Sequence, residues 1–454
     1  MPSLAVSPLR NSRKHPPALW FLAFSETWER FSYYGMQTLL TLYLATYLLN
    51  SNHAAGVIGI RSVRALLEGF YGPMSATAFA SAIFGFYTGF VYLTPVLGGL
   101  IADRLLGKTA TITLGAALMV AGHFAMAFEP ALFIALALLL IGTGCFKGNI
   151  ASQLGACYKP DDARRSHAFQ IFYLGISFGA ILAPLVCGTI GERLGWHLGF
   201  AAAGVGMIGG LAIYLAGRKH YPTSSGPRPP ADLSSPPSRQ TDRSIWSIVA
   251  LIPILAMLAI PNQQIFNAYL IWSKANYDFT LFGMTLPTTW LVALDAATTV
   301  ALLGASVAGW RLYARFFPEP DEFTKLALSG IVTMLAFLIL VVLSKFGQAG
   351  QISLVWAVMF HSINSLAFAN MIPVGLSLFS RTAPARLGAT AIGIYYTHLF
   401  IANNMVGWLG AFVETLPAQQ FWLAHVGIAG VGTIGILAFK VVSERMGSAK
   451  CLTD

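Results

Sequence analysis

Three charged side chains interrupt a long apolar segment near the start of the chain. The segment runs from Leu19 to Leu49, long enough to cross a bilayer as one helix, and it contains Glu26, Glu29 and Arg30. A charged residue at the centre of a membrane helix costs about 2.5–3.5 kcal/mol even on insertion scales. Ionisable residues kept at this cost usually face a polar cavity and take part in function. This segment is therefore the first candidate for chemistry.

The polar residues of the segment share one face of the expected helix. Positions 26, 29, 30, 33 and 37 follow the i, i+3, i+4, i+7, i+11 spacing, which places them on one stripe. The side chains on or next to this stripe are Glu26, Glu29, Arg30, Tyr33, Tyr34 and Gln37. A helix in which the glutamates merely pair with Arg30 would explain how the charges are tolerated, but not why a membrane helix carries them.

Composition indicates a membrane protein rather than a soluble one. Of the 454 residues, 56% are hydrophobic and 10% are charged, and the mean hydropathy is +0.65. The formal net charge of +10 does not indicate nucleic-acid binding, because the basic residues are scattered over short loops. The four cysteines form no CxxC pair, so we expect neither a disulfide framework nor a metal site, and no motif predicts a cofactor.

Apolar runs separated by charged or Pro/Gly-rich breaks predict an all-α membrane protein with twelve transmembrane helices. The expected spans are 19–49, 76–101, 109–128, 131–157, 166–191, 197–217, 245–272, 288–313, 323–345, 351–380, 386–413 and 419–442. With both termini in the cytoplasm, the inward loops and tails hold 21 of the 28 Lys and Arg residues, and the outward loops hold five. This excess predicts the orientation by the positive-inside rule.

A polar segment divides the spans into two groups of six. Residues 218–244 are rich in Pro and Ser, which predicts a flexible cytoplasmic linker without a core of its own. We therefore expect an N-terminal six-helix bundle over residues 1–217 and a C-terminal six-helix bundle over residues 245–454.

Two further polar motifs lie in the N-terminal half. Lys147 is too far inside the span 131–157 to snorkel to the membrane surface, so we expect it to join the first-span glutamates in one buried network. Asp103, Arg104 and Lys108 lie in a short glycine-containing loop between spans two and three. Their charges could contact neighbouring helix ends differently in different conformations, although a simple polar turn would have the same composition.

Three of these motifs resemble the proton-dependent oligopeptide transporter (POT) family of the major facilitator superfamily. The string Glu26-Thr-Trp-Glu29-Arg30-Phe31-Ser-Tyr33-Tyr34-Gly35 matches the family's E-x-x-E-R-F-x-Y-Y-G signature. The stretch 142–149 matches G-x-G-x-x-K-x-N, and the loop with Asp103 is similar to the short acidic-basic motif of the superfamily. The resemblance implies the major facilitator fold, alternating access to a central site, and proton-coupled import of small peptides or peptide-like solutes.

The resemblance also implies roles for two residues in spans two and five. Tyr92 stands where family members carry a tyrosine that lines the substrate site, although an isolated tyrosine in a membrane helix usually only packs. Ser177 stands where an asparagine is usual. Its window, Gly175 to Gly179, also matches G-x-S-x-G, but a nucleophile elbow needs a strand-to-helix turn or a positioned histidine. We therefore do not expect an enzyme.

The C-terminal half departs from the family pattern. The carboxylates usual in helices seven and ten are missing, because the corresponding stretches read Pro261-Asn262-Gln263-Gln264 and Phe368-Ala-Asn370-Met-Ile-Pro373. Tyr395 replaces a tryptophan that usually lines the site, and Gln37 replaces an arginine. A modified or capped peptide, or another small amide-containing solute, therefore stays open as an alternative substrate.

Asp295 is the only acidic residue inside the predicted C-terminal spans. It lies about two turns, roughly 10–12 Å, from the outward end of span 288–313, and it has no basic partner in spans seven to twelve. We expect it to replace the missing acids, by binding a substrate ammonium or by carrying a proton. The alternative is a helix-start aspartate that only reaches outer water.

These expectations define a proton-coupled symporter of the cell (inner) membrane. The expected coupling residues are Glu26, Glu29, Arg30, Lys147 and Asp295, and the expected gating residues are Asp103, Arg104 and Lys108. The expected substrate contacts are Arg30, Tyr33, Tyr34, Gln37, Tyr92, Lys147, Ser177, Asn262, Gln263, Asp295, Asn370 and Tyr395. Expected partners are a small peptide or peptide-like substrate, protons and the lipid bilayer, but no nucleic acid, and the expected working unit is a monomer. An exporter of another solute, a membrane hydrolase and a non-transporting sensor are the rival classes.

Overall fold

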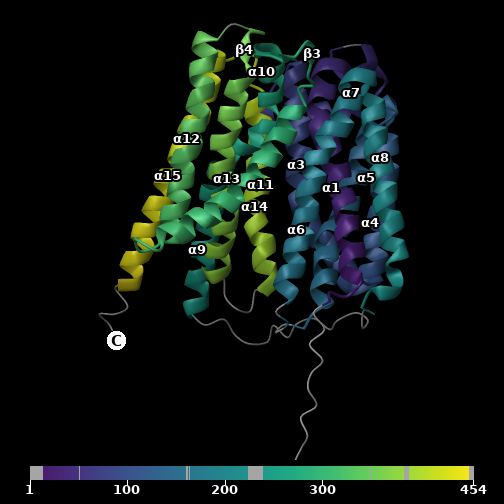
Figure 1. Cartoon of the computed structure of the whole chain (residues 1–454). Coiled ribbons are helices and arrows are strands. Elements are labelled where there is room, and N and C mark those ends of the chain that lie inside the picture. The colour runs from purple at the N-terminus through teal and green to yellow at the C-terminus, as the bar shows by residue number, and fades with distance from the viewer. Residues whose placement is uncertain are drawn as a thin grey trace, which may run out of the picture.

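Long helices run side by side through the molecule (Figure 1). The computed structural model describes residues 14–50, 52–159, 162, 164–222, 239–347, 349–382 and 388–448; side chains are left out at residues 52, 239–249, 380–382, 388–392 and 446–448. The predicted loop before span eleven, around Pro384, lies outside the described residues, as does residue 451.

The helices of the N-terminal half pack mainly on one another. They are α1 (Ala18–Tyr43), α2 (Ile60–Tyr71), α3 (Ala76–Ile101), α4 (Lys108–Ala125), α5 (Leu132–Ala156), α6 (Arg164–Ala183), α7 (Thr189–Leu194) and α8 (Trp196–Ala216). Helix α1 packs between α6 and α8, while α5 packs between α3 and α4. Short π-helical turns extend α1 to Leu48 and α3 to Leu106, and a third, Pro184–Gly188, joins α6 to α7.

The C-terminal half is built in the same way. Its helices are α9 (Arg239–Gln263), α10 (Ala268–Asn276), α11 (Trp290–Tyr313), α12 (Glu322–Phe346), α13 (Leu354–Thr382), α14 (Gly388–Gly410) and α15 (Ala418–Ser448). Helix α12 packs on α13 and α15, and α9 packs on α14 and α15. Four short strands lie at one end: β1 (Tyr277–Asp278) pairs with β4 (Ile352–Ser353), and β2 (Thr280–Leu281) pairs with β3 (Met284–Thr285). The halves meet through α3 against α14 and α6 against α11.

The helical architecture confirms the predicted fold class. Each of the twelve predicted spans coincides with a long helix or with helices joined by a short break. Within the described residues, eight helices are long and apolar enough to cross a membrane, and the bent pair α9–α10 raises the number to nine. Helix α1 falls below this criterion because polar residues interrupt it. Helix α9 begins at Arg239 rather than at residue 245, inside the predicted linker, and residues 223–238 lie outside the described part of the chain.

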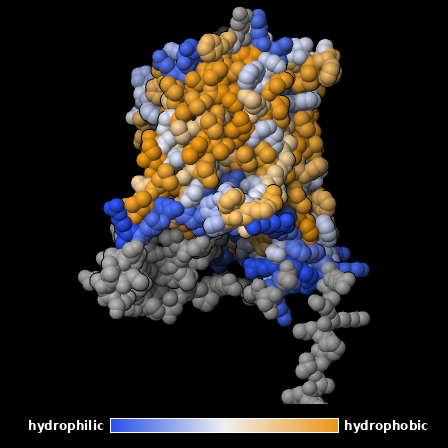
Figure 2. Space-filling model, turned by 60° about the vertical axis from the view of Figure 1, so that its left-hand side comes forward, coloured by the Kyte–Doolittle hydropathy of each residue, from blue (hydrophilic) through white to orange (hydrophobic). Residues whose placement is uncertain are grey.

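The outer surface is typical of a multi-pass membrane protein. A broad hydrophobic band covers the side of the bundle in Figure 2, and hydrophilic residues gather toward its two ends. Large apolar side chains such as Phe178, Ile434 and Val355 are more than half exposed, which is unfavourable in water but suits contact with lipid.

Helix α2, in the loop after the first span, was not predicted. The Arg64 guanidinium donates to Glu68 Oε1 (2.8 Å) one turn away, and the same oxygen accepts from the Met74 amide (3.2 Å). The hydrogen bond from Arg64, followed by that from Met74, lowers the pKa of the Glu68 carboxyl. The helix is only 12 residues long and mixes polar with apolar residues, so its sequence does not indicate a membrane span and it was not predicted.

Glycines let the N-terminal helices approach closely. A methyl group added at Gly98 of α3 would overlap the carbonyl oxygen of Gly144 in α5, whereas one added at Gly99 would meet nothing within 4 Å. Close backbone contact through small residues is the usual basis of helix association in membranes. The Gly98–Gly144 contact also fixes α5, and with it Lys147, against α3.

We predict that Gly98→Ala lowers the stability of the purified protein while Gly99→Ala leaves it unchanged. Overpacking a close contact typically costs about 1–3 kcal/mol. Thermal unfolding in one detergent, followed for both variants, measures the difference. Equal unfolding temperatures for the two variants would show that the α3–α5 contact relaxes without cost.

Candidate functional site

Two carboxylates and a guanidinium of α1 lie together in the protein interior. Arg30 Nε is 3.2 Å from Glu26 Oε1, one helical turn away, and it also donates to Glu29 Oε2. The three residues are 3%, 0% and 3% exposed for Glu26, Glu29 and Arg30. Unpaired charges are expensive in an environment of low dielectric constant, so this mutual pairing is what allows the cluster to be buried.

The same side chains retain polar atoms without partners. Among the described residues, these atoms include Glu26 Oε2, Glu29 Oε1, Arg30 Nη2, the Tyr33 hydroxyl and Gln37 Oε1. Buried polar atoms are normally hydrogen-bonded, by water if by no protein group. This face of α1 therefore offers both donors and acceptors to water, a proton or a ligand.

Lys147 lies beside this cluster but is not paired as predicted. No ion pair joins it to Glu26 or Glu29 among the described residues; instead, its Nζ lies 4.7 Å from the ring centroid of Tyr92 and 6.0 Å from that of Tyr33. The Tyr33 ring also lies 5.2 Å from the Arg30 guanidinium carbon. The single salt-bridge network was thus wrong in its contacts, because the aromatic faces of α1 and α3 occupy the space around the lysine and stabilise its charge through cation–π interactions.

The aromatic residues continue across to the other half of the protein. The ring of Tyr92 in α3 stacks on that of Tyr396 in α14, with centroids 6.3 Å apart and an angle of 18°. Tyr34 packs edge-on against Tyr33, with centroids 5.2 Å apart. Tyr92 therefore lies between the two halves, where it contacts Tyr396, a residue that the sequence did not single out; its contact with substrate stays a prediction.

Tyr395, the predicted site residue, points elsewhere. It is 1% exposed, and its hydroxyl donates to the carbonyl oxygen of Ile372 at 2.9 Å, within the C-terminal half. Successive residues of a helix point about 100° apart. The helix was therefore placed correctly, but Tyr396 rather than Tyr395 points toward the N-terminal half.

Three further polar residues predicted on the C-terminal side have different surroundings. Asn370 Oδ1 accepts from Ser306 Oγ (2.7 Å) and Trp310 Nε1 (2.8 Å), so its amide ties α13 to α11 rather than facing free space. Asn262 and Gln263 are buried at the end of α9, and Asn262 Nδ2 is among the unpartnered atoms of the described residues.

The helix that carries Asn262 and Gln263 is broken beside α1. Residues Gln264–Phe266 form a 3-10 turn, and the segments on either side of the break meet at 45°. Thr41 of α1 donates to the carbonyl oxygen of Phe266 at 3.1 Å. Discontinuous helices commonly line the sites of membrane transporters, because their free backbone groups need a cavity or a ligand.

Two residues predicted from the resemblance have local partners. The Ser177 hydroxyl donates to the Tyr173 carbonyl oxygen at 3.1 Å, as helical serines often do. Lys108 Nζ contacts Ser152 Oγ at 2.6 Å, whereas Asp103 and Arg104 are exposed at the end of α3. These contacts do not test the gating role, which stays a prediction.

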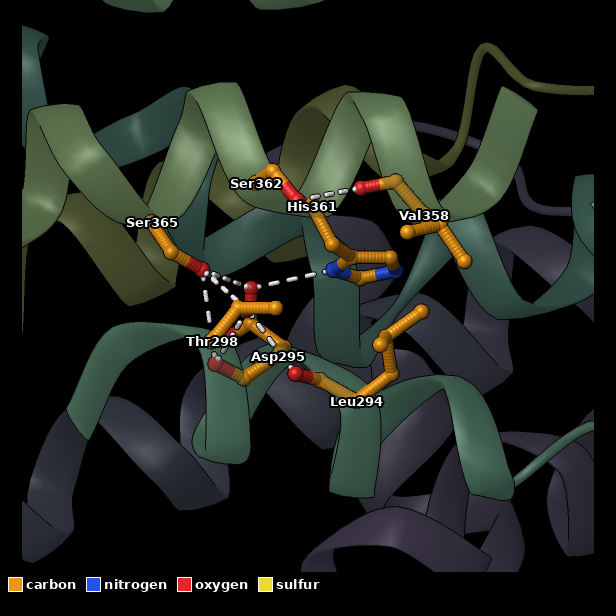
Figure 3. Close-up of polar contacts among 7 residues, drawn as sticks. All are labelled: Leu294, Asp295, Thr298, Val358, His361, Ser362 and Ser365. Atoms are coloured by element: carbon orange, nitrogen blue, oxygen red, sulfur yellow. Dashed lines mark hydrogen bonds and ion pairs between the residues drawn. The ribbon is translucent and has the colours of Figure 1, made fainter. Parts of the chain in front are cut away.

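Asp295 does have a basic partner, contrary to the prediction. Oδ1 of this α11 residue lies 3.1 Å from Nδ1 of His361 in α13, and the histidine is 0% exposed. Figure 3 shows Asp295, His361, Thr298 and Ser365 gathered between the two helices. The imidazole lies 66 residues away in the sequence, so no local spacing indicates the contact.

Hydrogen bonds between the halves gather at the end predicted to face outward. Glu192 Oε1 accepts from the Thr289 amide (2.8 Å) and Oε2 from the Thr288 amide (3.1 Å), so a carboxylate of α7 caps α11 of the other half. Arg193 donates to the Thr285 carbonyl oxygen at 2.7 Å. Between described residues, no hydrogen bond or ion pair joins the halves at the opposite end. The structure is therefore closed at the end predicted to face outward.

Known proteins are similar to this chain in sequence and fold. A family model described as the POT family matches residues 109–231. A di-/tripeptide transporter of Lactococcus lactis subsp. cremoris is 29% identical and covers 96% of this chain and 97% of its own, and the uncharacterized transporter YclF of Bacillus subtilis (strain 168) is 27% identical over 95% of each chain. A crystal structure of peptide transporter POT, a glutamate-to-glutamine mutant in complex with alafosfalin, has 26% identity, a TM-score of 0.81 and 97% coverage of both chains.

The fold and the charged central site define a transporter of the major facilitator fold. Within this class, the chain is similar to the POT family, whose model matches residues 109–231.

We predict that Glu192→Ala loosens the outward end. Loss of the carboxylate leaves the Thr288 and Thr289 amides without their acceptor, so their hydrogen exchange should accelerate by about tenfold or more, as expected when roughly 1.4 kcal/mol of protection is lost. Exchange mass spectrometry of peptides covering residues 285–292 measures this change. Glu68→Ala is the matched control, because its carboxylate lies at the same end but bonds only to its own half. Equal exchange in both variants would contradict the role of Glu192 in joining the two halves.

Proposed function

We propose that the protein is a proton-coupled symporter that imports small peptides or peptide-like solutes by alternating access. The observation that carries this proposal is the buried cluster of Glu26, Glu29 and Arg30, which keeps polar atoms without partners and has Lys147 beside it. The di-/tripeptide transporter among its relatives and the alafosfalin-bound POT structure support the choice of substrate class.

Charge balance suggests how a proton and a substrate are coupled. With both glutamates ionised, the two acids and the two bases Arg30 and Lys147 sum to zero. One proton on a glutamate leaves a net positive charge and frees part of the guanidinium's hydrogen-bonding capacity. A substrate carboxylate can then bind to Arg30 and Lys147 and restore neutrality, so protonation and substrate binding favour each other.

The opposite pole of the substrate site is assigned to Asp295. It is the nearest C-terminal substitute for the two carboxylates that the family pattern would place in helices seven and ten, and a substrate ammonium or a proton would neutralise it. Tyr34, Tyr92, Asn262 and Gln263 complete the proposed substrate contacts.

The second candidate function is a family member redirected to a modified peptide or another amide-containing solute, or acting as an exporter. The absence of the two carboxylates usual in helices seven and ten favours it.

Topology and assembly follow the same proposal. The loop charges support both termini in the cytoplasm of a cell (inner) membrane protein, with a monomer as the working unit. The two bundles, joined by the segment at 218–244, would then rock about the central site, and the structure corresponds to the state closed toward the outside.

We predict that Glu29→Gln and Lys147→Ala each abolish proton-driven accumulation in proteoliposomes. Glu29→Gln fixes a neutral side chain next to Arg30 and should spare substrate counterflow, which needs no net proton movement. Lys147→Ala removes one of the two positive charges and should weaken substrate binding as well. Glu68→Gln, on the outward helix α2, serves as the control and should transport normally. Full proton-driven uptake by either variant would remove the cluster from the mechanism.

The substrate class can be tested without a transport assay. A ligand that binds only the folded protein stabilises it by RT ln(1 + [L]/Kd), which is about 2.7 kcal/mol at a hundredfold excess over Kd. We expect a dipeptide or tripeptide, free or N-acetylated, to raise the unfolding temperature of the wild type. Arg30→Lys keeps the charge but loses the forked geometry, and should reduce this shift. A shift produced only by solutes that lack an amide and a carboxylate would overturn the proposed substrate class.

A further inference from the structure

The pair formed by Asp295 and His361 is a polar site enclosed within the C-terminal half. The aspartate side chain is 11% exposed and the histidine side chain 0%. Ser365 donates to Asp295 Oδ1 (3.4 Å) and to its carbonyl oxygen (3.3 Å), while the Ser365 and Thr298 hydroxyls share a hydrogen bond of 2.8 Å. As Figure 3 shows, these side chains from α11 and α13 point toward one another.

The hydrogen bond between Asp295 and His361 allows the pair to bind one proton. With an ionised carboxylate and a neutral imidazole that donates from Nδ1, the pair would carry one negative charge. One added proton makes the pair neutral overall, whether it resides on the carboxyl or on the imidazole. The contact between Nδ1 and Oδ1 can persist in either form, because one partner is always a donor and the other an acceptor.

The surroundings provide no other compensation for a negative charge. Among the described residues, no lysine or arginine forms an ion pair with Asp295, and His361 Nε2 is buried without a partner. The nearby titratable groups are weak acids. The ring of Tyr269 in α10 packs edge-on against the imidazole, with centroids 5.3 Å apart, and the ring of Tyr277 in β1 lies 6.5 Å from that of Tyr269. Tyr34 of α1 interacts electrostatically with Asp295.

The remaining helices packed around the pair add little charge. Phe337 of α12 contacts Phe360 of α13 and stacks on His425 of α15. Tyr173 of α6 interacts electrostatically with Tyr34. None of these groups supplies a fixed positive charge. An ionised, unoccupied pair is thus costly in this environment, whereas a singly protonated pair is neutral.

We propose that Asp295 and His361 together bind one transported proton, as the proton site of the C-terminal half. The proton enters from water at Asp295, the more exposed member, and returns to water there; His361 acts as a positioning and proton-sharing residue behind it. This inference rests on the proposed symport function and adds a second proton site to the α1 cluster. The pair lies six residues, roughly 9 Å, along α11 from Thr289, which Glu192 caps, so a change of its charge acts on the helix that closes the outward end.

The test is a double-mutant cycle on the pH dependence of transport. Asn at position 361 can still donate to Asp295 but cannot titrate, and Asn at position 295 removes the acid with little change in volume. We expect His361→Asn to shift the pH profile of proton-driven uptake by about one pH unit, a tenfold change in proton concentration. In the Asp295→Asn background it should cause no further shift, because the two residues share one proton. Counterflow should be retained in His361→Asn, which leaves Asp295 in place.

The matched control is His398→Asn. That histidine is also fully buried in the C-terminal half, but its Nδ1 contacts the Tyr395 carbonyl oxygen rather than a carboxylate. It should leave the pH profile unchanged. Ser365→Ala, which removes a donor to Asp295, should move the profile and provides a second variant should His361→Asn fail to fold.

A second measurement separates this inference from the proposed function. Proton uptake by the purified protein after a pH jump, read with a pH-sensitive dye, needs no substrate. Asp295→Asn should take up one proton fewer than the wild type, and Asp295→Asn with His361→Asn should take up no fewer than Asp295→Asn alone. Equal shifts by His361→Asn in both backgrounds, or unchanged proton uptake in Asp295→Asn, would overturn the shared site. Absence of peptide transport with the expected proton count would instead reject only the proposed function.

Discussion

Helix α1 buries two carboxylates and a guanidinium, which are costly to remove from water unless they pair with one another. A guanidinium held between two carboxylates satisfies part of its hydrogen-bonding capacity within one helix, so the cluster can enter the membrane without help from distant residues. Its remaining atoms still need partners. Next to these charges α1 and α3 place the rings of Tyr33 and Tyr92, which contact Arg30 and Lys147.

Close helix packing holds these residues in place. At Gly98 and Gly144 the backbones of α3 and α5 touch, and Gly85 of α3 packs against Gly407 of α14 across the two halves. These contacts bring Lys147 and Tyr92 to the cluster and place Tyr396 opposite. Side chains at such positions would separate the helices, so the smallest residues in the sequence determine where the largest and most polar ones meet.

The features that the sequence predicts well are those with a short-range cause. The stripe on α1, the helix spans and the pairing of Glu26 with Arg30 follow from helical periodicity and hydropathy. The partner of Lys147 depends on how α1, α3 and α5 rotate against one another, and the exchange of Tyr395 for Tyr396 is a rotation of one residue. The Asp295–His361 contact joins two helices whose relative register has no local signature, so neither composition nor spacing could reveal it.

The two halves deal with polar burial in different ways, and this difference bears on mechanism. In the N-terminal half, fixed charges of both signs compensate one another, so adding a proton creates a charge that a ligand can neutralise. In the C-terminal half, Asp295 has only an imidazole and hydroxyl groups around it, so adding a proton removes a charge. Under the proposed mechanism, one half would become a better anion site when protonated, while the other would become neutral and easier to bury. An alternating-access cycle can use both effects at once, since the first favours loading of an anionic group and the second lowers the cost of closing the bundle around it.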